Sequence, residues 1–318
     1  ANVAFAMQDL WTIDPRYLQE LLNRKIPFIS YLPIDQDPVS PLIFERLNLA
    51  YKIITFSKFG QKLLEDNGYA STMIYEGTDP DIFKPMDKEE CRKGLGLPQD
   101  AFIFGMIAAN KENPPRKGFQ EVLEAFKMFY EKHPEAAILF HTQQTNPGGF
   151  PIMDYARYLG IQARTFFIPQ VNATFFSDSN QIAKEMNACD VYLQPSMTEG
   201  FGLTTIEANS CGIPVIVNNC QSQPELVVSG KTGEVCETDK KWWRNSGGYV
   251  YTASVPSLCE KMEILYKRVR SERLLAKQCR EHIIENFNIN KIFKHQWLPF
   301  LLTLQDEILP LVDDKKQK

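Results

Sequence analysis

The sequence lacks closely spaced cysteine pairs, long apolar runs and a basic excess, and each absence excludes a class of protein. The seven cysteines are scattered and include no C-x-x-C pair, so neither a disulfide framework nor a zinc signature is indicated. No stretch approaches the ~20 consecutive apolar residues of a membrane span, and no basic-plus-apolar signal segment opens the chain. We therefore expect a protein of the reducing cytoplasm and leave peripheral membrane contact open.

Charge and glycine spacing exclude two further classes. The formal net charge is -4, which argues against a general nucleic-acid binder, because phosphate backbones require a basic face. No Gly-x-Gly-x-x-Gly follows an expected strand, which argues against a nicotinamide-dependent dehydrogenase. With 318 residues, of which 44% are hydrophobic and 23% charged, the chain has enough mass for two cores.

Apolar runs alternate with helical patterns along the chain, which is typical of βαβ units and a parallel sheet. The expected strands of the first part are residues 2–7, 27–32, 52–56 and 72–75, with helices near 15–24 and 58–67. Those of the second part are 101–107, 136–140, 164–168, 190–194 and 213–217, with helices near 119–130, 152–159, 181–188 and 203–211. From Ser254, a good N-cap, the pattern is helical almost to Pro310. The sequence therefore predicts two Rossmann-like units and a helical tail.

The stretch at residues 195–208 directly follows an expected strand and runs into an expected helix. In open α/β sheets, ligands bind outside the carboxyl ends of the strands. Gly200 and Gly202 let the backbone approach a ligand closely, and the N–H groups of Leu203 and Thr204 open the helix as an anion site. A phosphate group is the expected occupant.

Two glutamates lie eight residues apart in this stretch. Glu199 directly precedes Gly200, and Glu207 lies in the first turns of the expected helix, so both carboxylates can face one cleft. A carboxylate accepts the two hydrogen bonds that a ribose diol offers. The alternative interpretation is that Glu199 is a solvated loop residue and Glu207 only complements the helix dipole.

Residues 195–208, with residues 211–216 behind them, resemble the Glu-x7-Glu signature of the retaining GT-B glycosyltransferases of family four, or group 1. That family includes sucrose synthases, glycogen synthases and many mannosyltransferases. The resemblance places Glu199 near the transferred sugar and Glu207 on the nucleotide ribose. It places the diphosphate on the glycine loop and the helix N-terminus: Gly200, Phe201, Gly202, Leu203 and Thr204.

A second cluster lies at residues 108–118, at the carboxyl end of the strand expected at 101–107. The family usually shows Gly-Arg-Leu and, a few residues later, Lys-Gly, with the arginine and lysine on the diphosphate. Lys117 matches this lysine, Asn110 takes the place of the arginine, and Arg116 is expected to supply the missing charge. A solvated basic turn is the alternative.

Two further segments resemble the family. Residues 76–85 gather Gly, Pro and Asp and are similar to the family's linker between its two domains. Pro169 and Gln170 follow the strand expected at 164–168, where the resemblance implies backbone contacts to the nucleotide base; an ordinary strand end is the alternative.

The first part departs from the family pattern. Members carry a glycine-rich loop after their first strand and often a histidine at the end of a later strand, but all four histidines here lie beyond residue 132. At the place of that histidine, Asp35 is the nearest polar candidate for a catalytic role beside the acceptor. The pairs Asp35/Asp37 and Asp79/Asp81 spell the Asp-x-Asp of metal-dependent transferases, but they lie beside prolines or in the linker. We therefore expect no metal and no cofactor.

The resulting prediction is an α/β protein of the GT-B class, in which two Rossmann-like domains face a cleft. Residues 1–85 form an amino-terminal acceptor-side domain and linker, expected to be incomplete because an apolar strand begins at residue 2. Residues 86–285 form the nucleotide-sugar domain, and residues 286–318 form a helix that packs back toward the first domain.

The resemblance implies a retaining, metal-independent hexosyltransferase. Its donor is a nucleotide-diphosphate sugar of the UDP or GDP type, and its acceptor a glycan, lipid or protein hydroxyl. A non-catalytic sugar-nucleotide or glycan binding protein of the same fold is the alternative, and product formation separates the two.

Overall fold

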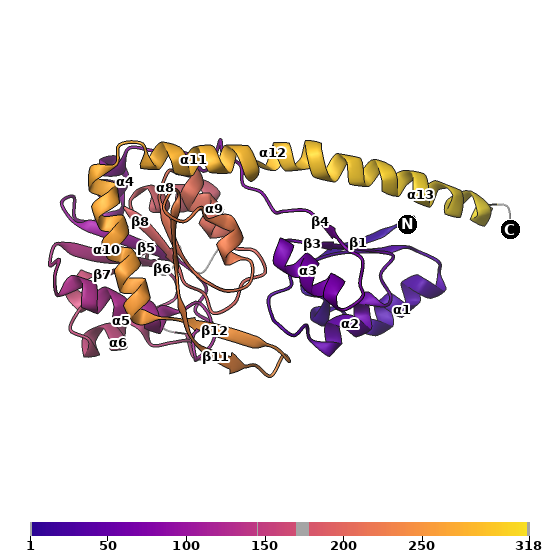
Figure 1. Ribbon diagram of the computed structural model, residues 1–318, viewed down its shortest axis with the longest axis horizontal. Helices are drawn as coiled ribbons and strands as arrows, with labels where there is room; N and C mark the ends of the chain where they lie inside the picture. Colours follow the sequence, from indigo (N-terminus) through magenta and orange to yellow (C-terminus); the bar gives the residue numbers. More distant parts are fainter. Residues whose placement is uncertain (1, 145, 170–177, 317–318) are drawn as a thin grey trace.

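A computed structural model of the chain describes residues 2–144, 146–169 and 178–316. It consists of two α/β units joined by an extended linker, and a long helical segment spans both units (Figure 1). In the described part of the chain, no helix combines the length and the apolar character required to cross a bilayer. All seven cysteines are buried free thiols.

The first unit is a four-stranded parallel sheet in the order β1-β2-β3-β4 with its helices. Its elements are β1 (Ala4–Met7), η1 (Leu10–Thr12), α1 (Pro15–Asn23), β2 (Phe28–Leu32), α2 (Pro41–Leu47), β3 (Lys52–Thr55), α3 (Lys58–Asp66) and β4 (Thr72–Met73). Strand β2 is buried at every position, as expected of an apolar run inside a parallel sheet that is covered on both faces. The strands agree with those predicted from the sequence, whereas α2 is an addition.

The second unit holds a six-stranded parallel sheet in the order β10-β9-β8-β5-β6-β7. Its strands are β5 (Phe102–Ile107), β6 (Ala136–His141), β7 (Thr165–Phe167), β8 (Val191–Gln194), β9 (Val215–Asn218) and β10 (Gly233–Cys236). Its helices are α4 (Lys88–Leu95), α5 (Phe119–Tyr130), α6 (Ile152–Tyr158), η2 (Gln162–Arg164), α8 (Ser179–Asn187), α9 (Leu203–Ser210) and η3 (Gln223–Leu226). Strand β5 pairs with β6 on one side and β8 on the other. The strand order therefore reverses beside β5, which makes this point the topological switch of the sheet.

Helix α5 shows how the sequence pattern builds the core of this unit. Phe119, Val122, Phe126 and Phe129 recur at helical spacing and have no exposed surface, as the apolar stripe predicts. Phe104 on β5 meets Phe129 edge-on at a centroid distance of 5.1 Å. Helix α5 is therefore fixed against β5, and the loop of residues 108–118, which carries Arg116 and Lys117, begins at the carboxyl end of that strand.

A β-hairpin absent from the sequence prediction follows β10. Strands β11 (Thr238–Trp243) and β12 (Tyr249–Ala253) pair antiparallel. The run of β-forming aromatic residues on both sides of Asn245-Ser246-Gly247-Gly248 is a hairpin signal that was available in the sequence.

The remaining chain is helical, as predicted, and returns to the first unit. Its elements are α10 (Val255–Ser271), α11 (Leu275–Asn286), α12 (Ile289–Ile292), η4 (Phe293–Trp297) and α13 (Leu298–Lys316). Trp297 meets Tyr31 of β2 edge-on at 5.0 Å, and Glu307 pairs with Lys52 of β3 at 2.9 Å. In Figure 1 the run from α11 to α13 lies along one side of both units.

Glu225 forms a second link between the two units. This residue of η3 accepts hydrogen bonds from Lys58 N at 2.9 Å and Phe59 N at 2.7 Å, the first two N–H groups of α3. Tyr75 donates its hydroxyl to the same carboxylate at 3.0 Å. A side chain of the second unit thus caps a helix of the first.

We expect Glu225→Ala to lower the free energy of unfolding by about 1–2 kcal/mol, the usual cost of losing a helix N-cap. The measurement is calorimetric unfolding of the full chain. Glu225→Gln is the matched control: it keeps one acceptor oxygen and should lose less. Equal losses of unfolding free energy in the two variants would show that the acceptor oxygen kept by Glu225→Gln contributes nothing, which would contradict the capping role.

Candidate active site

The two loops singled out in the sequence meet at the topological switch of the larger sheet. Residues 108–118 follow β5, and residues 195–202 follow its neighbour β8. The loops are bonded to each other: Met197 N donates to Arg116 O at 2.7 Å, and the Arg116 guanidinium donates to Thr198 O at 2.9 Å. The parallel topology therefore brings together residues that are about 80 positions apart in the chain.

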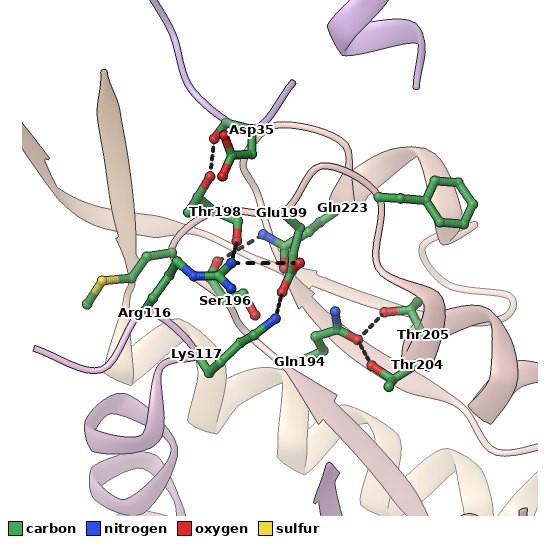
Figure 2. Close-up of polar contacts among 12 residues, drawn as sticks. Asp35, Arg116, Lys117, Gln194, Ser196, Thr198, Glu199, Thr204, Thr205 and Gln223 are labelled. Carbon is green, nitrogen blue, oxygen red and sulfur yellow. Dashed lines mark hydrogen bonds and ion pairs between the residues drawn. The ribbon is translucent and has the colours of Figure 1, made fainter. Parts of the chain in front are cut away.

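The side chains of Lys117 and Arg116 converge on the carboxylate of Glu199 (Figure 2). Lys117 Nζ donates directly to Glu199 Oε1, and Arg116 Nη1 lies 3.9 Å from Glu199 Oε2. Arg116 also pairs with Glu112 at 3.2 Å, and Glu112 pairs with Arg244 of the hairpin. The result is a chain of alternating charges that leads from Glu199 to the hairpin.

This cluster keeps Glu199 ionised. Burial by itself would raise the pKa of the carboxyl, but the charges of Lys117 and Arg116 outweigh it, so the pKa lies below its ordinary value. Glu199 is 9% exposed.

The N-terminus of α9 opens beside the cluster. Gln194, the last residue of β8, accepts hydrogen bonds through Oε1 from the hydroxyls of Thr204 and Thr205, the latter at 2.8 Å (Figure 2). These bonds fix the first turn of the helix, whose leading N–H groups have no partner within a helix. Such a turn binds anions through its N–H groups and its dipole.

Two glycines allow the backbone to take this path. Gly202, the N-cap of α9, has a φ of 120°, which L-residues with a side chain rarely adopt. Gly200 lies so close to the first unit that a Cβ there would overlap the ring of Pro33. Phe201, between them, is buried. The glycine loop is therefore in direct contact with the opposite wall.

A cleft of about 1920 Å³ lies between the units and contains this cluster. Its lining includes the predicted residues Asp35, Asn110, Arg116, Lys117, Glu199, Gly200, Phe201, Gly202, Leu203 and Thr204. Asp35 O accepts a hydrogen bond from the Thr198 hydroxyl (Figure 2). Burial raises the pKa of Asp35 to about 6, against the lowering effect of Arg116.

Glu207 and Pro169 are not among the described residues that line this cleft. Burial, with a contribution from the nearby charge of Glu76, raises the pKa of Glu207 to about 7. Glu76 itself does line the cleft, and burial raises its pKa to about 7 as well. Pro169 is exposed after β7, and Gln170 lies outside the described residues.

Asn110 uses its side chain to hold a neighbouring loop. Its amide donates to Gln143 O at 3.0 Å and to Phe150 O at 2.8 Å, and it accepts from Phe150 N at 2.7 Å. Although Asn110 lines the cleft, these bonds direct its amide to backbone. The positive charges next to Glu199 are those of Arg116 and Lys117, and their binding of a diphosphate stays a prediction.

Several cleft residues were not identified from the sequence. Asp9, just after β1, lines the cleft, and burial raises its pKa while Arg116 opposes the shift. The hairpin contributes Arg244, and the linker contributes Glu76. Asp9 could have been found as an acidic residue at the carboxyl end of a strand, but nothing local to the sequence marks the other two. Among the described residues, no group of three or more His, Cys, Asp or Glu side chains is arranged to hold a metal ion.

Comparison with known proteins agrees with this geometry. The sequence model of the family described as glycosyl transferases group 1 matches residues 87–242, which contain both loops of the cluster. Residues 87–242 belong to the group 1 glycosyltransferase family. The family predicted from the sequence is confirmed for these residues, whereas retention of configuration and the roles of the two glutamates stay predictions.

Curated relatives of this chain include two D-inositol 3-phosphate glycosyltransferases. The protein from Stackebrandtia nassauensis is 30% identical over 184 residues, which is 55% of this chain and 39% of the relative. The protein from Mycobacterium leprae is 31% identical over 166 residues, which is 51% of this chain and 35% of the relative. The matched part thus spans between about a third and two fifths of each relative.

Solved glycosyltransferase structures share the fold. Sucrose-phosphate synthase from Thermosynechococcus elongatus superposes with a TM-score of 0.71 over 91% of this chain and 71% of that chain, at 19% identity. HepE from Anabaena, solved with UDP and glucose, superposes with a TM-score of 0.67 over 91% of this chain and 76% of that chain, at 20% identity. The predicted GT-B architecture is therefore confirmed for this chain.

Proposed function

We propose that this chain transfers a hexose from a nucleotide-diphosphate sugar to an acceptor hydroxyl with retention of configuration. The observation that carries the proposal is the convergence of Lys117, Arg116 and Glu199 beside the open N-terminus of α9. Two cations and a helix dipole suit a diphosphate, and an ionised carboxylate suits the positive charge that develops on the sugar. The family membership of residues 87–242 supports the same reaction.

In this proposal the diphosphate lies on Lys117 and on the first turn of α9, at Leu203 and Thr204. Glu207 accepts hydrogen bonds from the ribose, and the backbone after β7 holds the base. The nucleotide is UDP or GDP. Structural neighbours that were solved with UDP support the nucleotide part of this assignment. The cations and the helix dipole offset the charge of the leaving nucleotide without a metal ion.

The chemical step needs few protein groups. The bond from the anomeric carbon to the diphosphate oxygen breaks, and the acceptor hydroxyl attacks from the same face. The proton of that hydroxyl passes to the departing phosphate oxygen. Glu199 stabilises the positive charge on the sugar ring, and Asp35, on the opposite wall, positions the acceptor hydroxyl. The seven buried thiols fit a reducing compartment, so we place the reaction in the cytoplasm.

The test is turnover of UDP-glucose and GDP-mannose, each with and without EDTA, with the anomeric configuration of the product read by NMR. Consumption of a donor in the presence of EDTA and an axial-to-axial outcome are expected. Nucleotide binding without consumption of either donor would favour a non-catalytic sugar-nucleotide binding protein. Failure to bind UDP or GDP would overturn the proposal as a whole.

A pH dependence follows from the raised pKa of Glu207. The free protein holds this carboxyl protonated below about pH 7, whereas a ribose diol donates best to the carboxylate. Nucleoside affinity should therefore rise as the pH rises, by about tenfold from pH 6 to pH 8 for a group that titrates in that window. Uridine is the probe for calorimetry because it carries no phosphate that titrates there. The Glu207→Gln variant should show a flat profile, and an equal pH dependence in that variant would contradict the assignment.

A further inference from the structure

Three of the four tryptophans in the chain line the interdomain cleft, and all three are more than half exposed. Trp11 is 56% exposed, Trp242 55% and Trp243 57%. Trp11 lies on η1 of the first unit, whereas Trp242 and Trp243 lie on β11 of the second. Large aromatic side chains left open to solvent in a concave site usually serve a ligand.

The hairpin that carries Trp242 and Trp243 is fastened to the opposite unit. Tyr249 N donates to Asp37 O at 3.0 Å, and the Gln36 amide donates to Ser246 Oγ at 2.8 Å. In the turn of the hairpin, Arg244 pairs with Glu112 in the loop of residues 108–118. The turn of the hairpin is therefore bonded both to the first unit and to the loop of the second unit that carries Arg116 and Lys117.

The register of the hairpin orients the two indoles differently. Trp242 pairs with Val250, which is buried and lines the cleft, so the two side chains share one face of the hairpin. Trp243 pairs with Tyr249 and packs edge-on against its ring at 4.9 Å. Trp242 therefore shares its face of the hairpin with the cleft residue Val250. Trp243 lies on the other face and packs against Tyr249.

The size of the cleft leaves room for a second molecule. Its volume of about 1920 Å³ exceeds the ~300–1,000 Å³ of an ordinary small-molecule site. The donor cluster at Lys117 and Glu199 occupies one region, and the tryptophans belong to other elements of the same lining. Leu42 of α2, which packs against η1, extends the apolar surface beside Trp11.

We propose that Trp11 and Trp242 form the binding site for a carbohydrate acceptor, with its pyranose rings stacked on the indoles. A pyranose presents C–H groups on its faces and hydroxyls at its edge. The cleft offers the complement, because Gln36, Asn245 and Ser246 line it next to the aromatic side chains. Gln36 and Ser246 bond to each other, but a purely apolar ligand such as an acyl chain would cover the exposed amide of Asn245 and offer it no hydrogen-bond partner. This inference deepens the proposed transfer reaction, on which it rests, by naming the acceptor class.

The test titrates the full chain with maltotriose, mannotriose and galactotriose, in the presence and absence of UDP. Binding is followed by intrinsic fluorescence and by saturation-transfer NMR. At least one trisaccharide should bind saturably, with transfer to its ring C–H protons. Trp242→Ala and Trp11→Ala should each weaken that binding at least tenfold and leave the affinity for UDP unchanged. Tyr158→Ala, which removes an exposed aromatic ring outside the described lining, is the matched control and should change neither affinity.

Each other outcome overturns the inference and spares the proposed function if UDP still binds. These outcomes are that no trisaccharide binds, that both tryptophan variants bind trisaccharide as tightly as the unaltered chain, or that Trp242 is needed only for binding phosphatidylglycerol vesicles. A chain that binds trisaccharide through the tryptophans but does not bind UDP or GDP would overturn the proposed function instead and retain a carbohydrate site.

Discussion

Glu199→Gln is expected to lower the turnover number by about 10²–10³, the usual effect of removing one electrostatic group aimed at a transition state. The substitution keeps the size of the side chain and removes only its charge. Glu199 is held ionised by Lys117 and Arg116, so the unaltered enzyme carries a full negative charge at this point. The loss should therefore fall on the chemical step.

Binding of the nucleotide separates this explanation from a general disruption of the site. In Glu199→Gln, Lys117 no longer shares its charge with a carboxylate, so the affinity for UDP should stay the same or increase. The measurements are kcat and KM for the donor together with calorimetric titration of UDP. Glu112→Gln is the matched control, because Glu112 also pairs with Arg116 but lies farther along the chain of charges. A fall in UDP affinity as large as the fall in kcat would contradict the assignment.

Lys117→Ala is expected to weaken binding of nucleoside diphosphate by about ten- to a hundredfold and to leave binding of the bare nucleoside nearly unchanged. A charge-assisted hydrogen bond contributes roughly 1.5–3 kcal/mol, and each 1.4 kcal/mol is about tenfold in affinity. Lys117 Nζ already contacts Glu199, so its ammonium lies within the cluster where the diphosphate is proposed to bind. Titrations with uridine, UMP and UDP at one ionic strength measure the effect phosphate by phosphate.

Arg116 and Lys111 provide the comparison for that result. The Arg116 guanidinium is engaged with Thr198 O at 2.9 Å and with Glu112, so Arg116→Ala should weaken UDP binding less than Lys117→Ala. Lys111 lies in the same loop and lines the same cleft but is exposed, and an exposed charge is screened by solvent and salt. Lys111→Ala should change the affinity less than twofold. If Arg116→Ala is the most damaging of the three, the proposed role of Lys117 is wrong.

Most strands and most helices could be predicted because their signals are local, whereas β10 and the hairpin strands β11 and β12 were not predicted. A few consecutive residues suffice to predict burial in three cases: the apolar runs of β2 and β8 and the helical stripe of α5. The glycine loop and Lys117 were identifiable for the same reason. Glycines that allow a close backbone approach, and a lysine that precedes a helix, are both visible within a few residues of sequence. The roles of Glu199, Glu207 and Asp35 in the reaction stay predictions.

The hairpin and the charge chain could not be assigned a function from local pattern. Arg244 meets Glu112 across 132 positions, and Gln36 meets Ser246 across 210. The first pair depends on the tertiary fold of the second unit, and the second pair depends on contact between the two units. Asp9 and Glu76 were also missed, because the burial that raises their pKa values arises only in the folded chain.

By itself the sequence determined that this chain forms parallel α/β units with a glycine loop between the strand that ends at Gln194 and a helix, because hydrophobic period, glycine position and helix termini act over a few residues. The tertiary structure decided where those pieces meet. Parallel pairing of β5 with β8 placed Lys117 and Arg116 on Glu199. Contact between the units placed Pro33, Asp35 and three tryptophans around the same cleft. These placements depend on strand order and interdomain packing, which are set by the sum of many distant contacts and not by any one segment.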